Sequence, residues 1–76
     1  MSQTNFERYA SSPAKVASLI IEHDYEEEAV RGIDEYLHVY LIEHDNLIEL
    51  GYFEGSWEFE EWLHSDLPFD EWRANR

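Results

Sequence analysis

A mainly α-helical domain, built as a bundle of three to four short helices, is the fold class that this sequence predicts. Apolar residues recur at intervals of three and four through much of the chain, and residues that favour helix N-termini precede several of these stretches. The length of 76 residues leaves room for one domain, and the 12 aromatic residues suit a small core that must be made of large side chains. We therefore expect residues 1–76 to form a single domain.

The chain is expected to begin with a polar arm over residues 1–11, whose aromatic residues Phe6 and Tyr9 dock onto the body. A helix of about three turns should follow. Ser12 is a suitable N-cap, and Pro13 suits the first helical position because it has no N–H that would need a partner. The apolar stripe of this helix would consist of Val16, Leu19, Ile20 and His23.

A second helix is expected from about residue 25 to at least residue 40. Asp24 followed by Glu27 has the form of a capping box, and the acids at positions 26–28 would favour a helix N-terminus because they complement the helix dipole. Gly32 would weaken this helix. Its inner face would be drawn from Ala29, Ile33, Tyr36, Leu37, Tyr40 and Leu41.

Residues 36–53 allow two interpretations. Residues 36–42 are rich in β-formers, and with residues 43–46 as a turn the chain could return as a hairpin, which would give an α+β fold. Alternatively, the apolar residues before Gly51 fit a short helix that ends in a glycine cap. We favour the helix and keep the hairpin as the alternative.

Two short helices complete the expected bundle, one at residues 57–64 with Ser56 as its N-cap and one at residues 67–72. Each contains the pattern Phe-acid-acid-Trp. Because Phe and Trp three positions apart share one helical face, both pairs should anchor their helices in the core. Trp62 should be more deeply buried than Trp72, since it belongs to the longer apolar stripe.

Charge is the most distinctive property of the chain. The 18 acidic and 5 basic residues give a net charge of −13, and between Glu22 and Glu71 there are 17 acids and a single base, Arg31. Direct binding to nucleic acid or to an anionic membrane is therefore disfavoured, because both would be repelled. A basic protein is the natural partner, unless the acids only keep a small protein soluble.

Catalytic and metal-binding patterns are weak. The chain has no Cys, its glycines are isolated, and no serine lies in a nucleophile elbow. Glu35 with His38 and Glu61 with His64 match the Glu-x-x-His spacing of di-iron proteins, but so Glu-rich a chain gives such matches by composition. We expect no catalytic residue, no metal and no cofactor.

No membrane or export segment is expected either. The first residues lack a basic stretch followed by an apolar run, and no later window approaches the ~20 apolar residues of a membrane span. We expect a cytoplasmic protein.

The acids have a spacing that suggests mimicry of nucleic acid. If residues 25–45 are helical, their acids recur about once per 4 Å of helix axis, close to the ~3.4 Å between phosphates of a single strand. A second row on the adjoining segments would complete a surface that can occupy a basic groove. The expected partner-binding residues are Glu26, Glu27, Glu28, Asp34, Glu35, Glu43 and Asp45 in the first row, and Glu54, Glu58, Glu60, Glu61, Asp66, Asp70 and Glu71 in the second.

A small, acidic, aromatic-rich chain without Cys resembles the nucleic-acid mimics that phages and mobile elements use against restriction and CRISPR enzymes. Residues 24–29 (Asp-Tyr-Glu-Glu-Glu-Ala) and 53–59 (Phe-Glu-Gly-Ser-Trp-Glu-Phe) are similar to the acidic helix and the Gly-aromatic segment of ArdA-type antirestriction proteins. Residues 5–8 (Asn-Phe-Glu-Arg) with residues 12–20 resemble the start of short phage proteins of Gram-positive hosts, many of which continue into cysteine clusters that are missing here.

This resemblance implies a stoichiometric inhibitor, of the anti-CRISPR or antirestriction kind, that blocks the nucleic-acid-binding surface of a host defence protein. Its partner would be a basic nucleic-acid-binding protein of the host, and a homodimer is compatible with this function. The alternative is an acidic interaction module or regulator that binds through exposed aromatic residues such as Trp57, Trp62 and Trp72.

Overall fold

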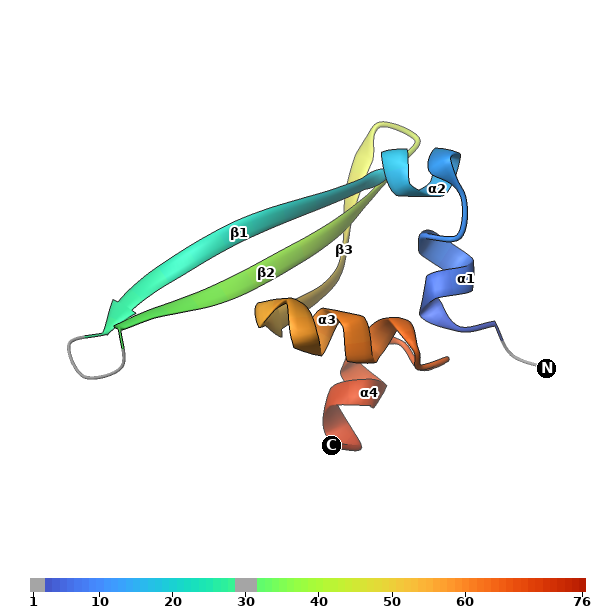
Figure 1. Ribbon diagram of the computed structural model, residues 1–76. Helices are drawn as coiled ribbons and strands as arrows, with labels where there is room; N and C mark the ends of the chain where they lie inside the picture. The colour runs from blue at the N-terminus through green and yellow to red at the C-terminus, as the bar shows by residue number, and fades with distance from the viewer. Residues whose placement is uncertain (1–2, 29–31) are drawn as a thin grey trace.

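The fold is α+β rather than mainly α-helical. A computed structural model describes residues 3–28 and 32–76, and residues 19–54, expected to be largely helical, contribute three strands (Figure 1). The elements are α1 (Asn5–Tyr9), α2 (Pro13–Ala17), β1 (Leu19–Glu28), β2 (Gly32–Glu43), β3 (Asn46–Glu54), α3 (Gly55–Leu63) and α4 (Phe69–Ala74).

The three strands form one antiparallel sheet in the order β1-β2-β3. β1 pairs with β2 along its whole length, from Leu19 opposite Leu41 to Glu28 opposite Gly32. Figure 1 shows that this hairpin extends well beyond the helices. The pairing of β2 with β3 is interrupted by a bulge, because Val39 lies opposite Gly51 whereas Tyr40 lies opposite Glu49.

A two-residue turn joins β2 to β3. His44 and Asp45 have φ angles of 50° and 65°, which is the left-handed conformation that the two central residues of a type I′ hairpin turn require. The hairpin considered as the alternative for residues 36–53 is therefore confirmed, and the favoured helix is wrong.

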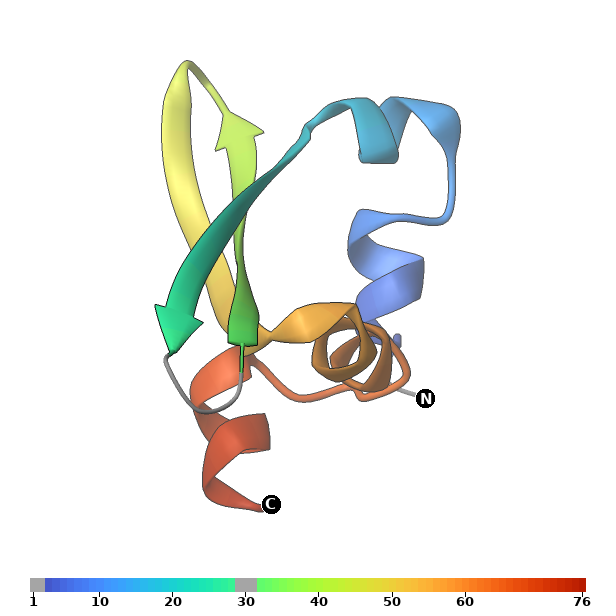
Figure 2. The same cartoon turned by 60° about the vertical axis from the view of Figure 1, so that its left-hand side comes forward.

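The helices cover one face of the sheet. In Figure 2, α1, α2 and α3 lie to one side of the strands, and α4 lies below their lower end. α3 contacts both β2 and β3. The buried hydrophobic residues among those described come from both layers and are Leu37, Val39, Phe53, Trp62 and Trp72.

Phe53 lies at the centre of this core and is fully buried. Its ring centroid is 5.2 to 5.8 Å from those of four other aromatic residues, which belong to α3 and α4. The two Phe-acid-acid-Trp segments supply all four rings, namely Phe59, Trp62, Phe69 and Trp72. The expected structural role is confirmed, and Trp62 is the more buried tryptophan at 2% exposure against 6% for Trp72.

The N-terminal arm contains a short helix that is tied to the body. The buried side chain of Asn5 donates hydrogen bonds to the carbonyls of Trp62 and Leu67, at 2.9 and 2.8 Å. Tyr9 stacks on Trp62 with ring centroids 5.9 Å apart, as expected for docking of the arm. Phe6, by contrast, is half exposed.

Several local expectations need correction. Ser12 does cap a helix, since its hydroxyl accepts from the Lys15 N–H, but that helix ends at Ala17 because residues 19–28 extend into β1. Asp24 and Glu27, expected to form a capping box, lie in the same strand. Ser56 caps nothing, because α3 begins at Gly55 after Glu54. Ala29, which was expected on the inner face of the second helix, lies outside the described residues.

Within residues 3–28 and 32–76, no helix is long and apolar enough to cross a membrane.

Candidate functional site

The two faces of the sheet differ in what covers them. Leu37 and Val39 of β2 and Phe53 of β3 point into the core, so the residues between them point the other way. No described helix packs on that second face. We call it the open sheet face and define it by Glu22 and Asp24 of β1, Tyr36, His38 and Tyr40 of β2, and Glu49, Tyr52 and Glu54 of β3.

Aromatic rings occupy the middle of the open sheet face. Tyr36 and Tyr52 stack with centroids 5.4 Å apart and planes 6° from parallel. The His38 ring lies 4.4 Å from that of Tyr52 and 6.3 Å from that of Tyr40. All four side chains are half-buried by one another and by their neighbours, so they form a continuous patch.

Carboxylates surround this patch. His38 lies between two of them, with Nε2 2.9 Å from an Asp24 oxygen and Nδ1 4.0 Å from a Glu49 oxygen. Glu22 is directly opposite His38, and Glu54 is directly opposite Tyr36. The patch therefore has an acidic rim on both edge strands.

The pKa of Tyr40 reflects these surroundings. It is raised above its ordinary value, first because its hydroxyl is partly desolvated and then because the negative charges of Glu22, Glu49 and Asp24 oppose ionisation. The tyrosine stays neutral at physiological pH, which keeps it both a donor and an acceptor of hydrogen bonds.

The end of the open sheet face near the β2–β3 turn is apolar. Ile42 lies opposite Leu47, and both are exposed, at 42% and 61%. Ile20 lies opposite Tyr40 and continues this apolar area onto β1. Exposed apolar and aromatic side chains beside an acidic rim are typical of protein-binding surfaces.

No protein-family model, curated protein or solved structure matches this chain.

The first row of predicted partner-binding acids falls on the hairpins instead of on a helix. Glu26, Glu27 and Glu28 end β1 and Asp34 begins β2, although the side chains of these four lie outside the described part of the structure. Glu35 points to the inner side of the sheet, where its carboxylate is 2.7 Å from His23 Nδ1. Glu43 is the last residue of β2, and Asp45 lies in the exposed turn that follows it. Because these residues lie in strands and a turn, their carboxylates do not have the spacing of about one per 4 Å that a helix would give.

The second row is divided among several surfaces. Glu54 lies on the open sheet face, whereas Glu60, Glu61 and Asp66 are exposed on the helical side. Asp70 and Glu71 are exposed in the first turn of α4. Glu58 is buried, and its carboxylate is held by Arg73 and Arg76. The structure therefore brings together few of the 14 predicted acids.

Sequence reasoning missed the residues that the structure does bring together. Glu22, Asp24 and Glu49 complete the acidic rim, and the aromatic patch consists of tyrosines and a histidine. The alternative function required three exposed tryptophans. Trp57 is 58% exposed, whereas Trp62 and Trp72 are buried in the core. Aromatic residues at three alternate positions, 36, 38 and 40, were the signal available in the sequence.

The Glu-x-x-His pairs do not form a common site in this fold. Glu35 and His38 lie on opposite faces of β2, because residues three apart in a strand point in opposite directions. Within the described ranges, no three His, Asp or Glu side chains are grouped so that they could hold a metal ion.

Proposed function

We propose that this protein is a non-catalytic binding protein that docks its open sheet face on a basic surface of a partner protein, in a stoichiometric complex. The observation that carries this proposal is the patch of three tyrosines and a histidine ringed by four carboxylates. Tyrosine is enriched in protein interfaces, and arginine side chains of a partner can stack on its ring while pairing with carboxylates.

The charge of the protein supports a basic partner. The three strands contain ten acidic residues and no Lys or Arg, so a positively charged surface would be attracted and oriented toward the sheet. The aromatic patch then supplies the area that becomes buried at the centre of the contact. This arrangement is that of an interaction module with acids at its rim.

A narrower hypothesis is that the partner's basic surface normally holds nucleic acid, as in host defence enzymes. It is supported by Glu22 and Asp24, which lie two residues apart on one strand face, about 6.8 Å along the chain. Two carboxylates at this distance beside flat rings present some of the chemistry of a nucleic-acid strand.

The docking proposal is tested by reversing charges on the two sides of the molecule. The partner is isolated from lysate with the wild-type protein, purified, and its affinity is measured by calorimetry. Glu22→Lys with Glu49→Lys changes the open sheet face, and Glu60→Lys with Asp66→Lys makes the same charge change on the helical side. We expect at least a tenfold loss of affinity, or about 1.4 kcal/mol, for the first pair and less than threefold for the second. Equal losses for both pairs would reject the open sheet face as the docking surface.

The narrower hypothesis needs a competition experiment. The protein is titrated into a preformed complex of its partner with labelled DNA or RNA, and release of the label is followed by fluorescence anisotropy. Release at one equivalent of protein is the expected result. Simultaneous binding of protein and nucleic acid with unchanged affinities would exclude mimicry and leave the docking proposal intact.

A further inference from the structure

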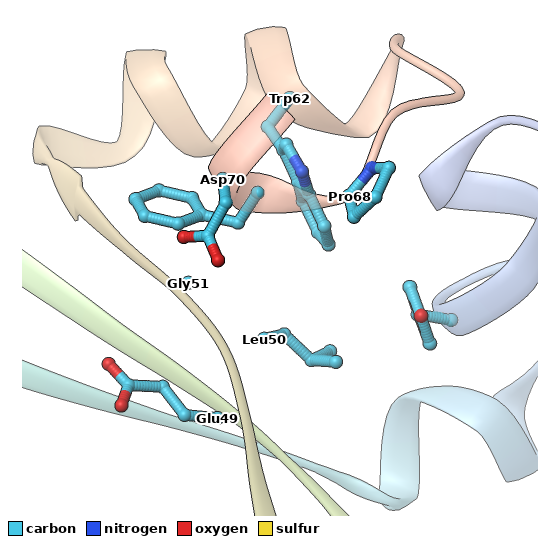
Figure 3. Close-up of a pocket in the computed structure, with 8 residues that line it drawn as sticks. Glu49, Leu50, Gly51, Trp62, Pro68 and Asp70 are labelled. Atoms are coloured by element: carbon cyan, nitrogen blue, oxygen red, sulfur yellow. The ribbon is translucent and has the colours of Figure 1, made fainter. Parts of the chain in front are cut away.

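A cavity of about 400 Å³ lies between the sheet and the helices. It is lined by four segments of the chain, namely the end of α1, the bulge of β3, the second half of α3 and the start of α4 (Figure 3). Its volume is within the ~300–1,000 Å³ range of ligand pockets. Its lining residues are Tyr9, Glu49, Leu50, Gly51, Trp62, Pro68, Phe69 and Asp70.

The bulge and a glycine shape the strand side of this cavity. Leu50 is the extra residue of the bulge, and it packs against the core from the cavity side. Gly51 has no side chain, and a Cβ there would lie 2.6 Å from Phe69 Cδ1, so the glycine allows the phenylalanine to approach the strand. The bulge and the absence of a side chain at Gly51 therefore determine where Leu50 and Phe69 lie in the cavity wall.

Aromatic rings form much of the cavity wall. Tyr9 and Trp62 are stacked on one another, and Phe69 contributes a third ring from the start of α4. The indole N–H of Trp62 is buried and has no acceptor among the described residues. The Phe69 ring already contacts a cation of the chain itself, because the Arg73 guanidinium carbon lies 5.1 Å from its centroid. Rings attract cations through their negative faces, so Tyr9 and Trp62 provide the attraction that remains for a ligand.

One carboxylate faces this space. In Figure 3 the Asp70 carboxylate extends from the start of α4 toward Gly51, while the Glu49 side chain runs away from the cavity across the sheet. None of the ion pairs among the described residues involves Asp70. An anionic ligand would be repelled by Asp70 and by the net charge of −13.

We propose that this cavity binds an organic cation carried on a short apolar chain, the chemistry of a lysine or arginine side chain or of a free alkylamine. The rings and Leu50 contact the chain, and Asp70 pairs with the cationic group. Glu49 is the one lining residue that also belongs to the open sheet face, and its side chain runs away from the cavity, so this proposal does not depend on the proposed function.

The test is a two-dimensional NMR titration of the ¹⁵N-labelled full chain with N-acetyl-lysine methylamide. The reporters are the indole N–H of Trp62 and the backbone amides of Gly51 and Asp70. A probe of about 14 non-hydrogen atoms at ordinary ligand efficiency should bind with a dissociation constant of roughly 1 mM. N-acetyl-norleucine methylamide, which lacks the ammonium group, should bind at least tenfold more weakly.

Variants separate a specific site from general attraction by an acidic surface. Asp70→Asn should weaken lysine binding at least fivefold, Asp70→Glu should restore most of it, and Asp66→Asn in the neighbouring loop should change it less than twofold. Circular dichroism of each variant shows whether α4 has been lost. If Asp70→Asn unfolds the protein, the comparison of the lysine and norleucine probes on the wild-type protein still shows whether the cavity requires a cationic group.

A further titration distinguishes a free alkylamine from a peptide side chain as the source of the cation. Binding of butylammonium as tight as that of the blocked lysine identifies a free amine as the ligand, and weaker binding identifies a peptide side chain. Equal binding of lysine and norleucine, equal effects of Asp66→Asn and Asp70→Asn, or shifts confined to the amides of Glu22, Asp24 and Tyr52 on the open sheet face would each overturn the proposal.

Discussion

At the scale of single residues, the carboxylate of Glu58 joins three segments of the chain. It accepts a hydrogen bond from the Glu54 N–H at 2.9 Å, and it forms ion pairs with Arg73 and Arg76. Its side chain is 5% exposed. A buried charge is costly unless it is paired, so these partners hold the end of β3, α3 and α4 in one arrangement.

Removing this charge should destabilise the protein. Hydrogen bonds to a charged group contribute about 1.5–3 kcal/mol, and we expect Glu58→Gln to lower the free energy of unfolding by an amount near the lower limit, because both guanidinium groups are partly exposed. Urea denaturation measures the change. Glu60→Gln, at an exposed position two residues further along α3, should change the stability by less than about 0.5 kcal/mol.

The same carboxylate should make stability depend on pH. Burial alone would raise the pKa of Glu58, but the Glu54 N–H and the charges of Arg76 and Arg73 lower it below its ordinary value overall. Its contribution is therefore fully present above the unfolded pKa of about 4.3 and is lost as the pH falls through the lowered folded pKa. Denaturation curves between pH 2 and 7 should show wild type and Glu58→Gln converging in acid. A constant difference throughout this range would contradict the assignment.

At the scale of elements, the β2 strand explains why the sequence predicted a helix. Leu37, Val39 and Leu41 alternate with Tyr36, His38 and Tyr40, so large side chains occupy every position and the period of two is hidden. The same residues contain intervals of three and four, which fit a helix equally well. The outward-facing positions would normally be polar, and the aromatic residues found there are the ones that build the open sheet face.

The β1 strand was missed for a different reason. Glu and Asp are disfavoured in strands, and the acidic run at residues 22–28 has the composition of a helix N-terminus. Pairing with β2 overrides this preference, because residues 19–28 all find partners along it. The helices at both ends were predicted more accurately, since Pro13 and the paired Phe and Trp residues determine local structure without long-range partners.

The sequence predicted which kinds of residue form the candidate site, but not which residues come together in it. Acidity and aromatic content are visible in composition, but their grouping depends on register, which places His38 opposite Glu22 on one side and Tyr52 on the other. Register in turn depends on the turn at His44 and Asp45 and on the bulge at Leu50. These features have no unambiguous signal in a single sequence.

The β2–β3 turn offers a test of the hairpin. Asp45 has a φ of 65°, which glycine adopts without the steric cost that a Cβ imposes, and the turn type favours glycine at this position. We expect Asp45→Gly to raise the free energy of unfolding by up to about 1 kcal/mol, as measured by thermal and urea denaturation. Asp66→Gly provides the matched change in another exposed loop and should not stabilise. If Asp45→Gly destabilises the protein by a comparable amount, the turn has a different conformation.

At the scale of the whole molecule, charge is divided between the sheet and the helices. The strands contain ten acids and no base, whereas four of the five basic residues belong to α1, α2 and the C-terminal segment. Two of those four, Arg73 and Arg76, are engaged with Glu58. The negative field is therefore strongest on the sheet, and a basic partner would approach from that side.

This division predicts how association should respond to salt. Attraction between the sheet and a basic partner acts at long range, and charges more than about 8–10 Å apart are screened at physiological ionic strength. Raising the salt concentration from 20 to 200 mM should slow the association of the wild-type protein with its purified partner by roughly tenfold, with a smaller effect on dissociation. Surface plasmon resonance or stopped-flow fluorescence measures both rates.

The charge-reversal pairs make this prediction specific to the sheet. Glu22→Lys with Glu49→Lys should slow association and flatten its salt dependence, whereas Glu60→Lys with Asp66→Lys, which changes the net charge equally, should leave the salt dependence close to that of the wild type. Individual exposed ion pairs contribute only about 0–1 kcal/mol, so neither Lys substitution alone should produce the full effect. An association rate that does not change with salt, or one that falls equally for the two pairs, would mean that net charge rather than its placement on the sheet governs the encounter.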